Sequence, residues 1–325
     1  MSKAIRLQEY GDPDVLKLTD VEVSPPASGE VQIEHGAVGL NFIDVYMRTG
    51  AYPLPDFPAG IGLEGAGRVI AVGENVTELK EGDRVAYVSR PVGAYAQVRN
   101  LAAERVVVLP DSIDDVTAAA MMLQGLTTQY LLRQTYNVKS GDNILIHAAA
   151  GGVGLMVCQW ANHLGATVIG TVGSEEKAEL ARAHGCHHTI NYRTENFQEQ
   201  VRDLTDGTGV NVVYDSIGKD TFMDSLDSLK KMGTMVTFGA ASGPLPLFDP
   251  ALLGKKGSLF LTRPTVFDYI AERDDLLNMA AQLMDVVVSG AVKIEINQRY
   301  ALADAAEAHR DLEARKTTGS TVLIP

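Results

Sequence analysis

Three small residues, Ala149, Gly151 and Gly154, follow the apolar stretch 143–147. They occupy the three positions of the G-x-G-x-x-G pattern, with an alanine in place of the first glycine. Glycines at this spacing let the backbone approach a phosphate, and the first N–H groups of a helix that begins there point at the anion. This chemistry is the binding of a pyrophosphate. The residues expected to contact it are Gly151, Gly152 and Val153.

The neighbouring sequence has the pattern of a βαβ unit. Residues 143–147 form a short apolar run, which predicts a buried parallel strand. Apolar residues then recur at helical spacing over 153–164, Gly165 stands where a helix C-cap belongs, and 166–172 is a second β-branched stretch. A glycine triplet alone would equally fit a tight turn between packed elements. The strand and helix on its two sides favour a dinucleotide site.

The end of the second predicted strand indicates which dinucleotide binds. NAD sites usually carry an acidic residue there, which accepts a hydrogen bond from the ribose 2′-hydroxyl. This chain has Gly173 and Ser174 instead, and Lys177 follows three residues later. Ser174 can cap the next helix, and Lys177 can meet a 2′-phosphate. The sequence therefore predicts NADPH rather than NADH; the alternative is that Lys177 is one more solvated helix lysine.

Length and composition place the chain among two-domain globular proteins. Its 325 residues exceed what one hydrophobic core usually supports. The net charge of −13 opposes general nucleic-acid binding, which needs clustered basic residues. Two cysteines cannot form a disulfide framework, and the sequence shows neither a signal peptide nor an apolar run long enough to span a membrane. We therefore expect a cytoplasmic protein.

The first hundred residues have short strands separated by turn signals, which predicts a β-rich domain. Residues 41–48 are expected to form a short helix within it, and three prolines over 52–58 predict an irregular loop. The expected strands are 3–8, 16–23, 30–38, 67–72, 84–88, 94–99 and 106–109.

The middle of the chain alternates strands with helices, which predicts a doubly wound parallel sheet. Two helices, 114–122 and one ending near 136, should precede it. Beyond the βαβ unit the expected elements are strands 188–192, 210–215, 234–239 and 258–262 and helices 196–204 and 220–231. The remainder, expected as helix 267–289, strand 293–300, helix 302–315 and strand 321–324, is too short for a domain and should return to the first one. The fold class is α/β.

Four motifs in order carry a resemblance: Asn41-Phe-Ile-Asp44, Gly62-Leu-Glu64-Gly65-x-Gly67, Gly82-Asp83-x-Val85 and the glycine turn. Together they resemble the medium-chain dehydrogenase/reductase superfamily over essentially the whole chain. Within it, the sequence is similar to the zinc-independent NADPH quinone oxidoreductases, the zeta-crystallin-like branch. The resemblance implies a GroES-like catalytic domain (1–124 and 266–325), an inserted Rossmann domain that binds NADPH (125–265), a nicotinamide between them, and homodimers formed by edge-to-edge pairing of the cofactor-domain sheets.

The zinc ligands of related enzymes are missing from the matching segments. Zinc alcohol dehydrogenases of the superfamily have Cys and His ligands there, whereas this chain has Leu63 at the histidine position and no cysteine before Cys158. Glu64 alone cannot hold a catalytic zinc, which needs three protein ligands. The one cluster of metal-binding residue types is expected to be polar turn residues: His184, Cys186, His187 and His188.

Without a Lewis acid, oxidation of an alcohol lacks its usual stabilisation of the alkoxide. A quinone needs less help, because its carbonyls are electron-poor and a hydroquinone anion delocalises its charge. We therefore expect hydride transfer from NADPH to a quinone. An NADPH-dependent enone or alkene reductase is the close alternative. A non-catalytic NADPH-binding protein, of the lens-crystallin or RNA-binding kind known among zeta-crystallin relatives, is a third, although no basic patch supports RNA binding.

The resemblance also assigns roles near the nicotinamide. Asn41 would orient the ribose or a substrate oxygen with Asp44 one helical turn away, and Tyr46 and Tyr52 would border the substrate. The alternatives are a helix N-cap for Asn41, a solvated first-turn charge for Asp44 and core aromatics for the two tyrosines. Asn41 and Tyr46 are also expected to contact the cofactor. In the family, the segment that contains Gln124, Thr127 and Tyr130 lies near the nicotinamide end of the cofactor. The alternative is that these residues only cap and pack a helix.

The remaining cofactor residues follow the later strands, where ligands bind in open α/β sheets. Tyr192 ends the third strand and could meet the 2′-phosphate or adenine. Arg315 matches a position from which related enzymes bring an arginine to that phosphate; otherwise it is a helix-terminal cation. The others expected to contact the cofactor are Ser216, Phe238, Gly239, Ala240, Ala241, Pro264, Thr265 and Val266.

Overall fold

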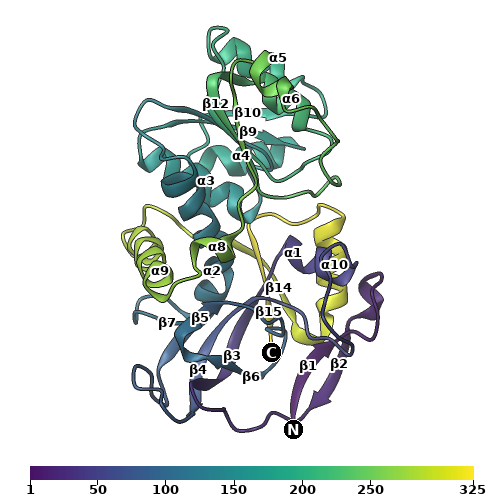
Figure 1. Cartoon of the computed structure of the whole chain (residues 1–325), viewed down its shortest axis with the longest axis vertical. Coiled ribbons are helices and arrows are strands. Elements are labelled where there is room, and N and C mark those ends of the chain that lie inside the picture. The colour runs from purple at the N-terminus through teal and green to yellow at the C-terminus, as the bar shows by residue number, and fades with distance from the viewer. The chain divides into compact units, whose positions relative to one another are not determined.

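The computed structural model describes residues 1–325, and the chain divides into two compact units (Figure 1). Unit 1 comprises Met1–Gln124, Ala271–Ala281 and Ile294–Pro325. Unit 2 comprises Gly125–Ile270 and Gln282–Lys293. Unit 1 is thus assembled from segments far apart in the sequence.

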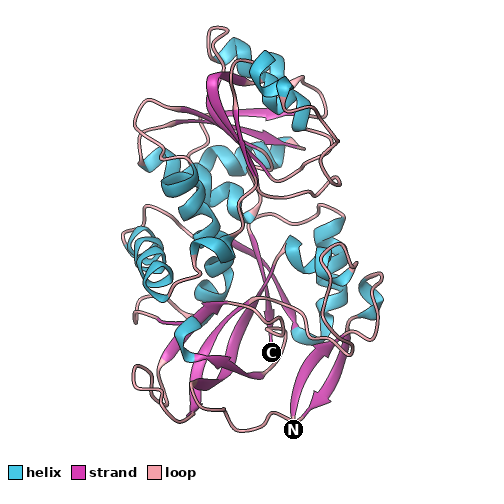
Figure 2. Ribbon diagram, in the orientation of Figure 1, coloured by secondary structure: helices cyan, strands magenta, loops and turns pink.

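Unit 1 is built mainly on antiparallel strands (Figure 2), with one parallel pair at the edge, β14 (Ile296–Ala301) with β15 (Ser320–Ile324). Its seven-stranded sheet has the order β14, β15, β3 (Glu30–Leu40), β4 (Glu64–Val72), β5 (Arg84–Val88) and β7 (Val106–Val108), with β6 (Val98–Ala102) paired to β3. A separate antiparallel pair consists of β1 (Ser2–Arg6) and β2 (Lys17–Val21). β15 pairs with β3 from Thr321↔Leu40 to Leu323↔Val38, which confirms that the C-terminal tail returns to the first domain.

Side chains on alternate positions of the unit 1 strands form a common core. Val31 and Ile33 of β3 pack with Val69 of β4 and with Val85 and Tyr87 of β5. This alternation is the pattern of a sheet with one buried face. Two helices lie outside the sheet, α1 (Phe42–Arg48) and α10 (Ala305–Glu313), and 3₁₀ turns cover Pro13–Val15, Ala103–Arg105 and Leu302–Asp304.

Unit 2 contains a six-stranded, wholly parallel sheet, which confirms the doubly wound prediction. The strand order is β10 (His188–Asn191), β9 (Thr167–Val172), β8 (Asn143–Ile146), β11 (Val210–Asp215), β12 (Leu229–Thr237) and β13 (Phe260–Thr262). The order reverses at β8, and ligands of such sheets bind where it does so, at the carboxyl ends of the strands.

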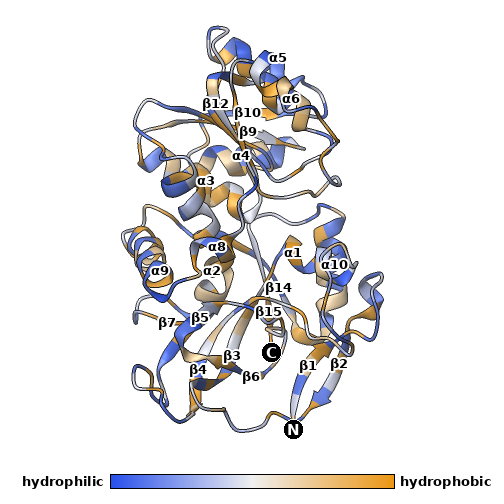
Figure 3. Ribbon diagram, in the orientation of Figure 1, coloured by the Kyte–Doolittle hydropathy of each residue, from blue (hydrophilic) through white to orange (hydrophobic).

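Helices cover the parallel sheet of unit 2. They are α3 (Gly152–His163), α4 (Glu175–Ala183), α5 (Phe197–Leu204), α6 (Phe222–Asp227) and α7 (Ala251–Lys255). The short helix α8 (Val266–Tyr269) instead contacts α2 (Asp115–Tyr130) through the stacked rings of Tyr269 and Tyr130. Phe197 of α5 and Phe222 of α6 pack on Leu145, Ile169 and Val213 of the strands. The strands are coloured largely as hydrophobic in Figure 3, as expected for a sheet buried on both faces.

One long helix, α2 (Asp115–Tyr130), continues through the residues where the sequence suggested a break between two helices, and a π-helical turn follows it over Leu131–Thr135. Gly125 lies within this helix. A Cβ there would come within 2.5 Å of the Leu283 side chain. The glycine therefore reflects close packing against α9 (Arg273–Val288) and not a helix end.

Residues 282–293 belong to unit 2, whereas the sequence analysis placed them in the first domain. Leu283 packs against Gly125, Gln282 accepts a hydrogen bond from Gln129 at 3.1 Å, and Gln159 donates to the carbonyl of Lys293 at 3.0 Å. Unit 2 also extends to Ile270, a few residues past the expected boundary at 266. Tertiary packing, which local sequence does not reveal, decides both boundaries.

Three further predicted elements differ from the structure. The expected strand 94–99 is displaced to β6, because Tyr95 and Gln97 bond their backbones to Ile61 and Lys3 outside the sheet. The expected helix 220–231 ends at Asp227, because the next residues already pair as β12 with β11. The expected helix 267–289 is two helices, α8 and α9, because Ile270 leaves the helical conformation.

Candidate active site

Glu64 is the first residue of β4, and its carboxyl group is fully buried in unit 1. The side-chain amide of Asn41, at the N-cap of α1, donates a hydrogen bond to Glu64 Oε1, and the backbone N–H of Leu123 donates to Oε2 at 2.6 Å. Gly39 leaves room for this carboxyl, because a Cβ at residue 39 would lie 2.2 Å from Oε1. Three chain segments thus converge on one acid.

Asp44 lies one turn into α1 and is also fully buried. Its Oδ2 accepts hydrogen bonds from the backbone N–H of Asn41 and from the hydroxyl of Tyr95, each at 2.9 Å, while Oδ1 has no partner. This placement contradicts the interpretation of Asp44 as a solvated charge. The bond to the Asn41 N–H joins this buried carboxyl to the start of α1.

Burial shifts the protonation of both acids. It raises the pKa of Glu64 to about 8, although the bonds from Leu123 and Asn41 lower it. It raises the pKa of Asp44 to about 7, against the lowering effect of the bonds from Asn41 and Tyr95. Desolvation disfavours a carboxylate whose neighbours include no cation. Asn41 is therefore held between two acids that take up protons near neutral pH.

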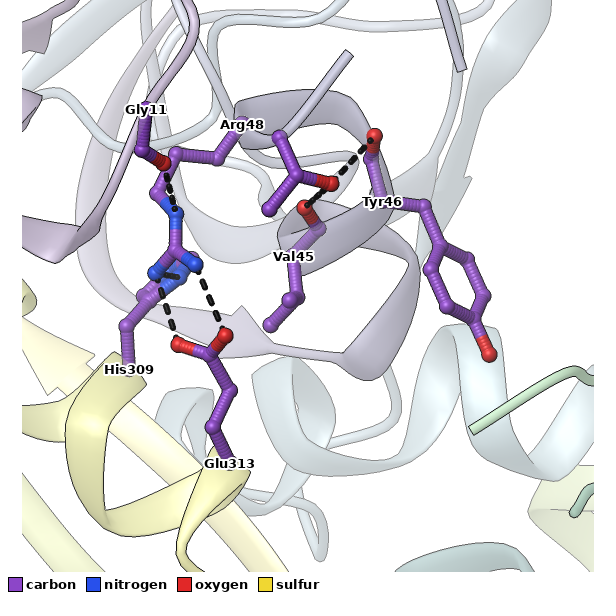
Figure 4. A network of polar contacts seen from close by, with 7 residues as sticks. Gly11, Val45, Tyr46, Arg48, His309 and Glu313 are labelled. Carbon is purple, nitrogen blue, oxygen red and sulfur yellow. Dashed lines mark hydrogen bonds and ion pairs between the residues drawn. The ribbon is translucent and has the colours of Figure 1, made fainter. Parts of the chain in front are cut away.

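A second polar chain runs from Asp44 to the surface of unit 1, and Figure 4 shows its outer part, from His309 through Arg48 to Glu313. Arg48 Nη1 lies 3.3 Å from His309 Nδ1, and His309 Nε2 lies 3.2 Å from the Tyr95 hydroxyl. Arginine only donates, so His309 Nδ1 is an acceptor and its proton is on Nε2. Burial, with the Arg48 charge, lowers the pKa of His309 to about 3. His309 is neutral, and its N–H donates to Tyr95, which donates to Asp44.

An aromatic group lies on and beside α1. The rings of Phe42 and Tyr46 have centroids 5.2 Å apart, and so do those of Tyr46 and Tyr52. Tyr46 and Tyr52 are only partly buried, and Figure 4 shows the Tyr46 ring directed away from Arg48. Packed rings with partly exposed edges can hold a flat conjugated ligand.

Helix α3 of unit 2 begins at the glycine turn. Gly151 is its N-cap and no side chain caps the first turn, so the N–H groups of Gly152 and Val153 meet no capping side chain. A Cβ at Gly154 would lie 2.3 Å from the carbonyl oxygen of Ala148, which shows how closely α3 packs on the turn. Ala148 itself has φ +54°. This geometry suits a pyrophosphate at the start of a helix.

The end of β9 has no acidic side chain. Gly173 stands there, and a Cβ on it would lie 2.6 Å from the Tyr192 hydroxyl and 3.5 Å from Arg193 Nε. Ser174 caps α4 by accepting from the N–H of Lys177 at 3.3 Å, which confirms the predicted cap. The structure therefore brings Gly173, Tyr192 and Arg193 together next to the first turn of α4. Arg193 and the hydroxyls of Ser174 and Tyr192 lie at this edge, and Lys177 stands in the first turn of α4 with Glu175 and Glu176. A guanidinium and two hydroxyls suit an additional phosphate.

Other predicted residues line the carboxyl edge of the unit 2 sheet. A Cβ at Gly239 would lie 2.6 Å from the Ser216 carbonyl oxygen, and Ala241 donates its N–H to that oxygen at 3.1 Å. Arg263 donates to the carbonyl of Gly239 at 3.1 Å. The turns after β11, β12 and β13 are thereby joined. The remaining predicted residues of these turns are Phe238, Ala240, Pro264, Thr265 and Val266.

Thr127 and Tyr130 lie on α2 within unit 2, where the Tyr130 ring stacks on Tyr269 at 4.5 Å and 7°. Tyr130 is hydrogen-bonded with Thr127, and burial raises the pKa of Tyr130. Gln124 lies on the same helix within unit 1 and donates to Asn41 Oδ1 at 3.1 Å. Arg315 follows α10 in unit 1 with φ +59° and is exposed.

The histidine and cysteine cluster is not assembled into one site. His184 Nδ1 bonds the Leu180 carbonyl, His187 Nδ1 accepts from the N–H of Val168, and Cys186 Sγ bonds backbone carbonyls. No group of three or more His, Cys, Asp or Glu residues in the chain could hold a metal ion. No helix is long and apolar enough to cross a membrane.

Sequence reasoning missed the second layer around Asn41. From the sequence, Glu64 is only an insufficient zinc ligand, and nothing singles out Tyr95, His309 or Ser320. Arg193, beside Gly173 in unit 2, is likewise not predicted. An acidic residue directly before Gly65 and Gly67 was the available signal for Glu64. Arg193 could have been found as the residue next to Tyr192.

Family profiles match both parts of the chain. The profile described as the alcohol dehydrogenase GroES-like domain matches residues 27–111, and that described as zinc-binding dehydrogenase matches residues 152–285. Each match lies mainly in one unit.

Full-length relatives share about half of the residues. The chain is 54% identical to a quinone oxidoreductase of Pseudomonas aeruginosa over 100% of both chains. It is 45% identical to a 2-haloacrylate reductase of Burkholderia sp., over 100% of this chain and 99% of that one. Its structure matches that of the Escherichia coli quinone oxidoreductase complexed with NADPH at a TM-score of 0.98 and 45% identity, over 99% of this chain and 100% of that one.

Proposed function

The chain belongs to the quinone oxidoreductase family of the medium-chain dehydrogenase/reductase superfamily, and we propose that it transfers hydride from NADPH to a quinone. The observation that carries the choice of NADPH as the hydride donor is the end of β9, where Gly173, Ser174 and Lys177 replace the acidic residue of an NAD site. Unit 2 would bind the cofactor, and unit 1 would supply the residues that orient the substrate.

The residues of unit 2 suit the parts of NADPH. Gly151, Gly152 and Val153 would hold the pyrophosphate at the start of α3. A group of four residues would hold the 2′-phosphate and adenosine: Gly173, Ser174, Lys177 and Tyr192. The joined turns at Ser216, 238–241 and 264–266, with Thr127 and Tyr130, would border the nicotinamide half, and Gln124 and Arg315 of unit 1 would complete the set. Bound NADPH supplies a hydride from its reduced ring.

The residues of unit 1 orient a carbonyl substrate without a metal. Leu63, buried at the position where zinc-dependent relatives have a histidine, offers no ligand atom. The Asn41 amide is fixed by Glu64 and Gln124, which leaves one N–H and one oxygen lone pair for the ribose or the substrate. The partly exposed rings of Tyr46 and Tyr52 can pack on a flat acceptor. Water can protonate the hydroquinone anion, so no general acid is required.

Steady-state kinetics test the substrate class. We expect NADPH-dependent reduction of 1,4-benzoquinone with a kcat/KM at least about tenfold above that for an α,β-unsaturated ketone. A ratio at least tenfold in favour of the ketone would reverse the assignment. Stabilisation by NADPH without turnover of any quinone would instead support a binding protein.

Reduction of an activated alkene is the second candidate, and one relative favours it. The 2-haloacrylate reductase at 45% identity is named for an alkene conjugated to a carboxylate. Hydride delivery to a conjugated carbon uses the same approach geometry as delivery to a quinone. 2-Chloroacrylate should therefore be included with the quinone and the ketone in the same assay.

The choice of cofactor is tested with the Lys177→Ala variant. Loss of a charged hydrogen bond to a phosphate costs about 1.5–3 kcal/mol, so the Kd for NADPH should rise roughly 10- to 150-fold. The Kd for NADH should change little. Lys139→Ala is the matched control, because Lys139 is exposed in the turn before β8 at the opposite end of the strands. Equal weakening of both cofactors would remove the phosphate role of Lys177.

We also propose a homodimer in the cytoplasm. β13 is an edge strand of the unit 2 sheet, and Phe260 on it is 62% exposed. Pairing of β13 with a second copy would cover this apolar edge. Both cysteines, Cys158 and Cys186, are buried thiols, which suits a reducing compartment.

A further inference from the structure

Four side chains of unit 1 form one continuous hydrogen-bond chain. The Ser320 hydroxyl donates to Gln124 Oε1 at 2.8 Å, Gln124 Nε2 donates to Asn41 Oδ1 at 3.1 Å, and Asn41 Nδ2 donates to Glu64 Oε1. All four residues are buried. The chain therefore joins the C-terminal strand β15 to the N-cap of α1 and to β4.

The direction of every bond in this chain follows from Glu64. An ionised carboxylate only accepts, so Asn41 must turn its NH₂ group toward Glu64 and its oxygen toward Gln124. A carboxamide has a donor end and an acceptor end on opposite sides. The orientation of Asn41 therefore fixes that of Gln124, and Gln124 fixes the direction of the Ser320 hydroxyl.

No cation is hydrogen-bonded to Glu64, because Arg99 donates to the Tyr87 hydroxyl at 3.4 Å instead. The titratable groups that act on it are the Asp44 carboxyl on α1, the Tyr87 hydroxyl on β5 and the Tyr95 hydroxyl. Asp44 raises the pKa of Glu64 further, in addition to the effect of burial. A proton taken up on Oε1 turns this atom from an acceptor into a donor.

We infer that Glu64 is a positioning residue, and that proton uptake by Glu64 reverses the hydrogen-bond chain as far as Ser320. A protonated Glu64 donates to Asn41 Oδ1, Asn41 Nδ2 then donates to Gln124 Oε1, and Gln124 Nε2 donates to Ser320 Oγ. The proton comes from solvent and no other bond changes. Because the side-chain amide of Asn41 rotates by half a turn, the N–H and the oxygen lone pair that lie outside the chain exchange positions.

This inference rests on the proposed function in one respect, namely that Asn41 contacts the cofactor or the substrate. The protonation state of Glu64 then decides whether Asn41 offers a donor or an acceptor at a given point of the ligand. Glu64 itself touches neither. Its effect is transmitted only through the amide of Asn41.

The Glu64→Gln variant separates this role from simple packing. The glutamine introduced there can still accept from the Leu123 N–H with its side-chain oxygen, and its NH₂ group must then face Asn41. The variant therefore holds the chain permanently in the reversed direction. Glu34→Gln is the matched control, because it makes the same change at an exposed position of β3.

Nuclear magnetic resonance of the ligand-free, full-length protein tests the reversal. The side-chain NH₂ signals of Asn41 and Gln124 should shift together with a midpoint near the Glu64 pKa of about 8. The shift with this midpoint should be absent in Glu64→Gln, where only the smaller effect of Asp44, with its pKa of about 7, remains, and it should be present in Glu34→Gln. NH₂ signals of Asn41 that stay constant from about pH 6 to about pH 10, or a joint shift of Asn41 and Gln124 that is unchanged in Glu64→Gln, would overturn the inference.

Infrared spectroscopy of wild-type protein labelled with ¹³C-carboxyl glutamate provides a measurement that needs no variant. A buried carboxylic acid band should disappear with the same midpoint as the Asn41 shift. If the two midpoints differ by more than about one pH unit, Glu64 does not drive the reversal.

Binding of NADPH connects the reversal to function. In the wild type, the Kd for NADPH should change with pH around the same midpoint. In Glu64→Gln, this change in Kd should be absent. An identical pH profile in both proteins would contradict positioning by Glu64. Failure of the wild type to bind NADPH would contradict the proposed function alone, because the titrations of the ligand-free protein stand without the cofactor.

Discussion

Arg48 and Glu313 form a two-point ion pair that joins α1 to α10. Nη1 and Nη2 of Arg48 each lie 2.8 Å from a carboxylate oxygen of Glu313, and Nε donates to the Gly11 carbonyl at 3.0 Å (Figure 4). Arg48 is 1% exposed and Glu313 33%. The pair therefore fixes the helix whose N-cap is Asn41, because a buried guanidinium cannot move away from its only carboxylate without cost.

Removal of the Glu313 charge should destabilise unit 1. In Glu313→Gln the buried Arg48 keeps its charge without a counterion, and we expect the free energy of unfolding to fall by about 1–3 kcal/mol. Glu307→Gln, the same change at another position of α10 that carries no ion pair to Arg48, should alter it by less than about 0.5 kcal/mol. Urea denaturation of the three proteins measures both values. Equal midpoints for the two variants would show that the ion pair does not stabilise the fold.

The two buried acids should make the protein less stable as the pH rises above neutrality. Folding raises the pKa of Asp44 from 3.8 to about 7 and that of Glu64 from 4.5 to about 8. The folded state then holds protons that the unfolded state has lost. The free energy of unfolding therefore falls as the pH rises toward the pKa values of the folded state. Each group contributes a slope of about −1.4 kcal/mol per pH unit while it remains protonated in the folded state.

The useful window for this measurement is from about pH 6.5 to about pH 8. Burial lowers the pKa of His35 to about 4 and that of His309 to about 3. These two histidines make the protein more stable as the pH rises, but only up to the ordinary histidine pKa of 6.5. Urea unfolding should show a falling free energy across the window and a smaller slope in Glu64→Gln. A slope unchanged in that variant would mean that Glu64 is ionised in the folded protein.

Gly39 should not tolerate even one methyl group. In Gly39→Ala the new Cβ would stand 2.2 Å from Glu64 Oε1 and 2.4 Å from the Ala119 carbonyl oxygen, and we expect a loss of about 1–3 kcal/mol in the free energy of unfolding. Gly254→Ala is the matched control: nothing lies within 4 Å of its Cβ position in α7. That change should stabilise the protein by about 0.5–1 kcal/mol. Thermal melts compare the two, and equal melting temperatures would contradict the crowding around Glu64.

The parallel sheet of unit 2 could be predicted because its signals are local. A strand, a glycine turn and a helix follow each other within residues 143–164, and Ser174 and Asn196 cap the helices that begin after them. Boundaries set by packing could not be predicted in this way. The sequence predicted two helices between 114 and 136, yet Gly125 lies inside the single helix α2, where it makes room for Leu283 more than a hundred residues later.

The candidate active site was only partly predictable for the same reason. The motif around Asn41 could be found from a short segment, but its partners are 23 and 83 residues away at Glu64 and Gln124. Ser320 is 196 residues from Gln124. Nothing in the sequence near Asp44 indicates that Tyr95 and His309 enclose it, so a solvated first-turn charge stayed open as the alternative to a role in the site. Burial of a charged group is a property of the assembled sheet.

Tyr46 should act through its ring and not through its hydroxyl. Tyr46→Phe keeps the contacts with Phe42 and Tyr52 at 5.2 Å, and since water can protonate the product, kcat/KM for 1,4-benzoquinone should stay within about threefold of the wild type. Tyr46→Ala removes the ring contacts, worth about 0.5–1.5 kcal/mol, and should raise KM roughly 2- to 13-fold with kcat little changed. Tyr300→Ala, which removes a partly buried ring on β14, should leave KM unaffected. A large loss of kcat in Tyr46→Phe would identify the hydroxyl as the proton donor instead.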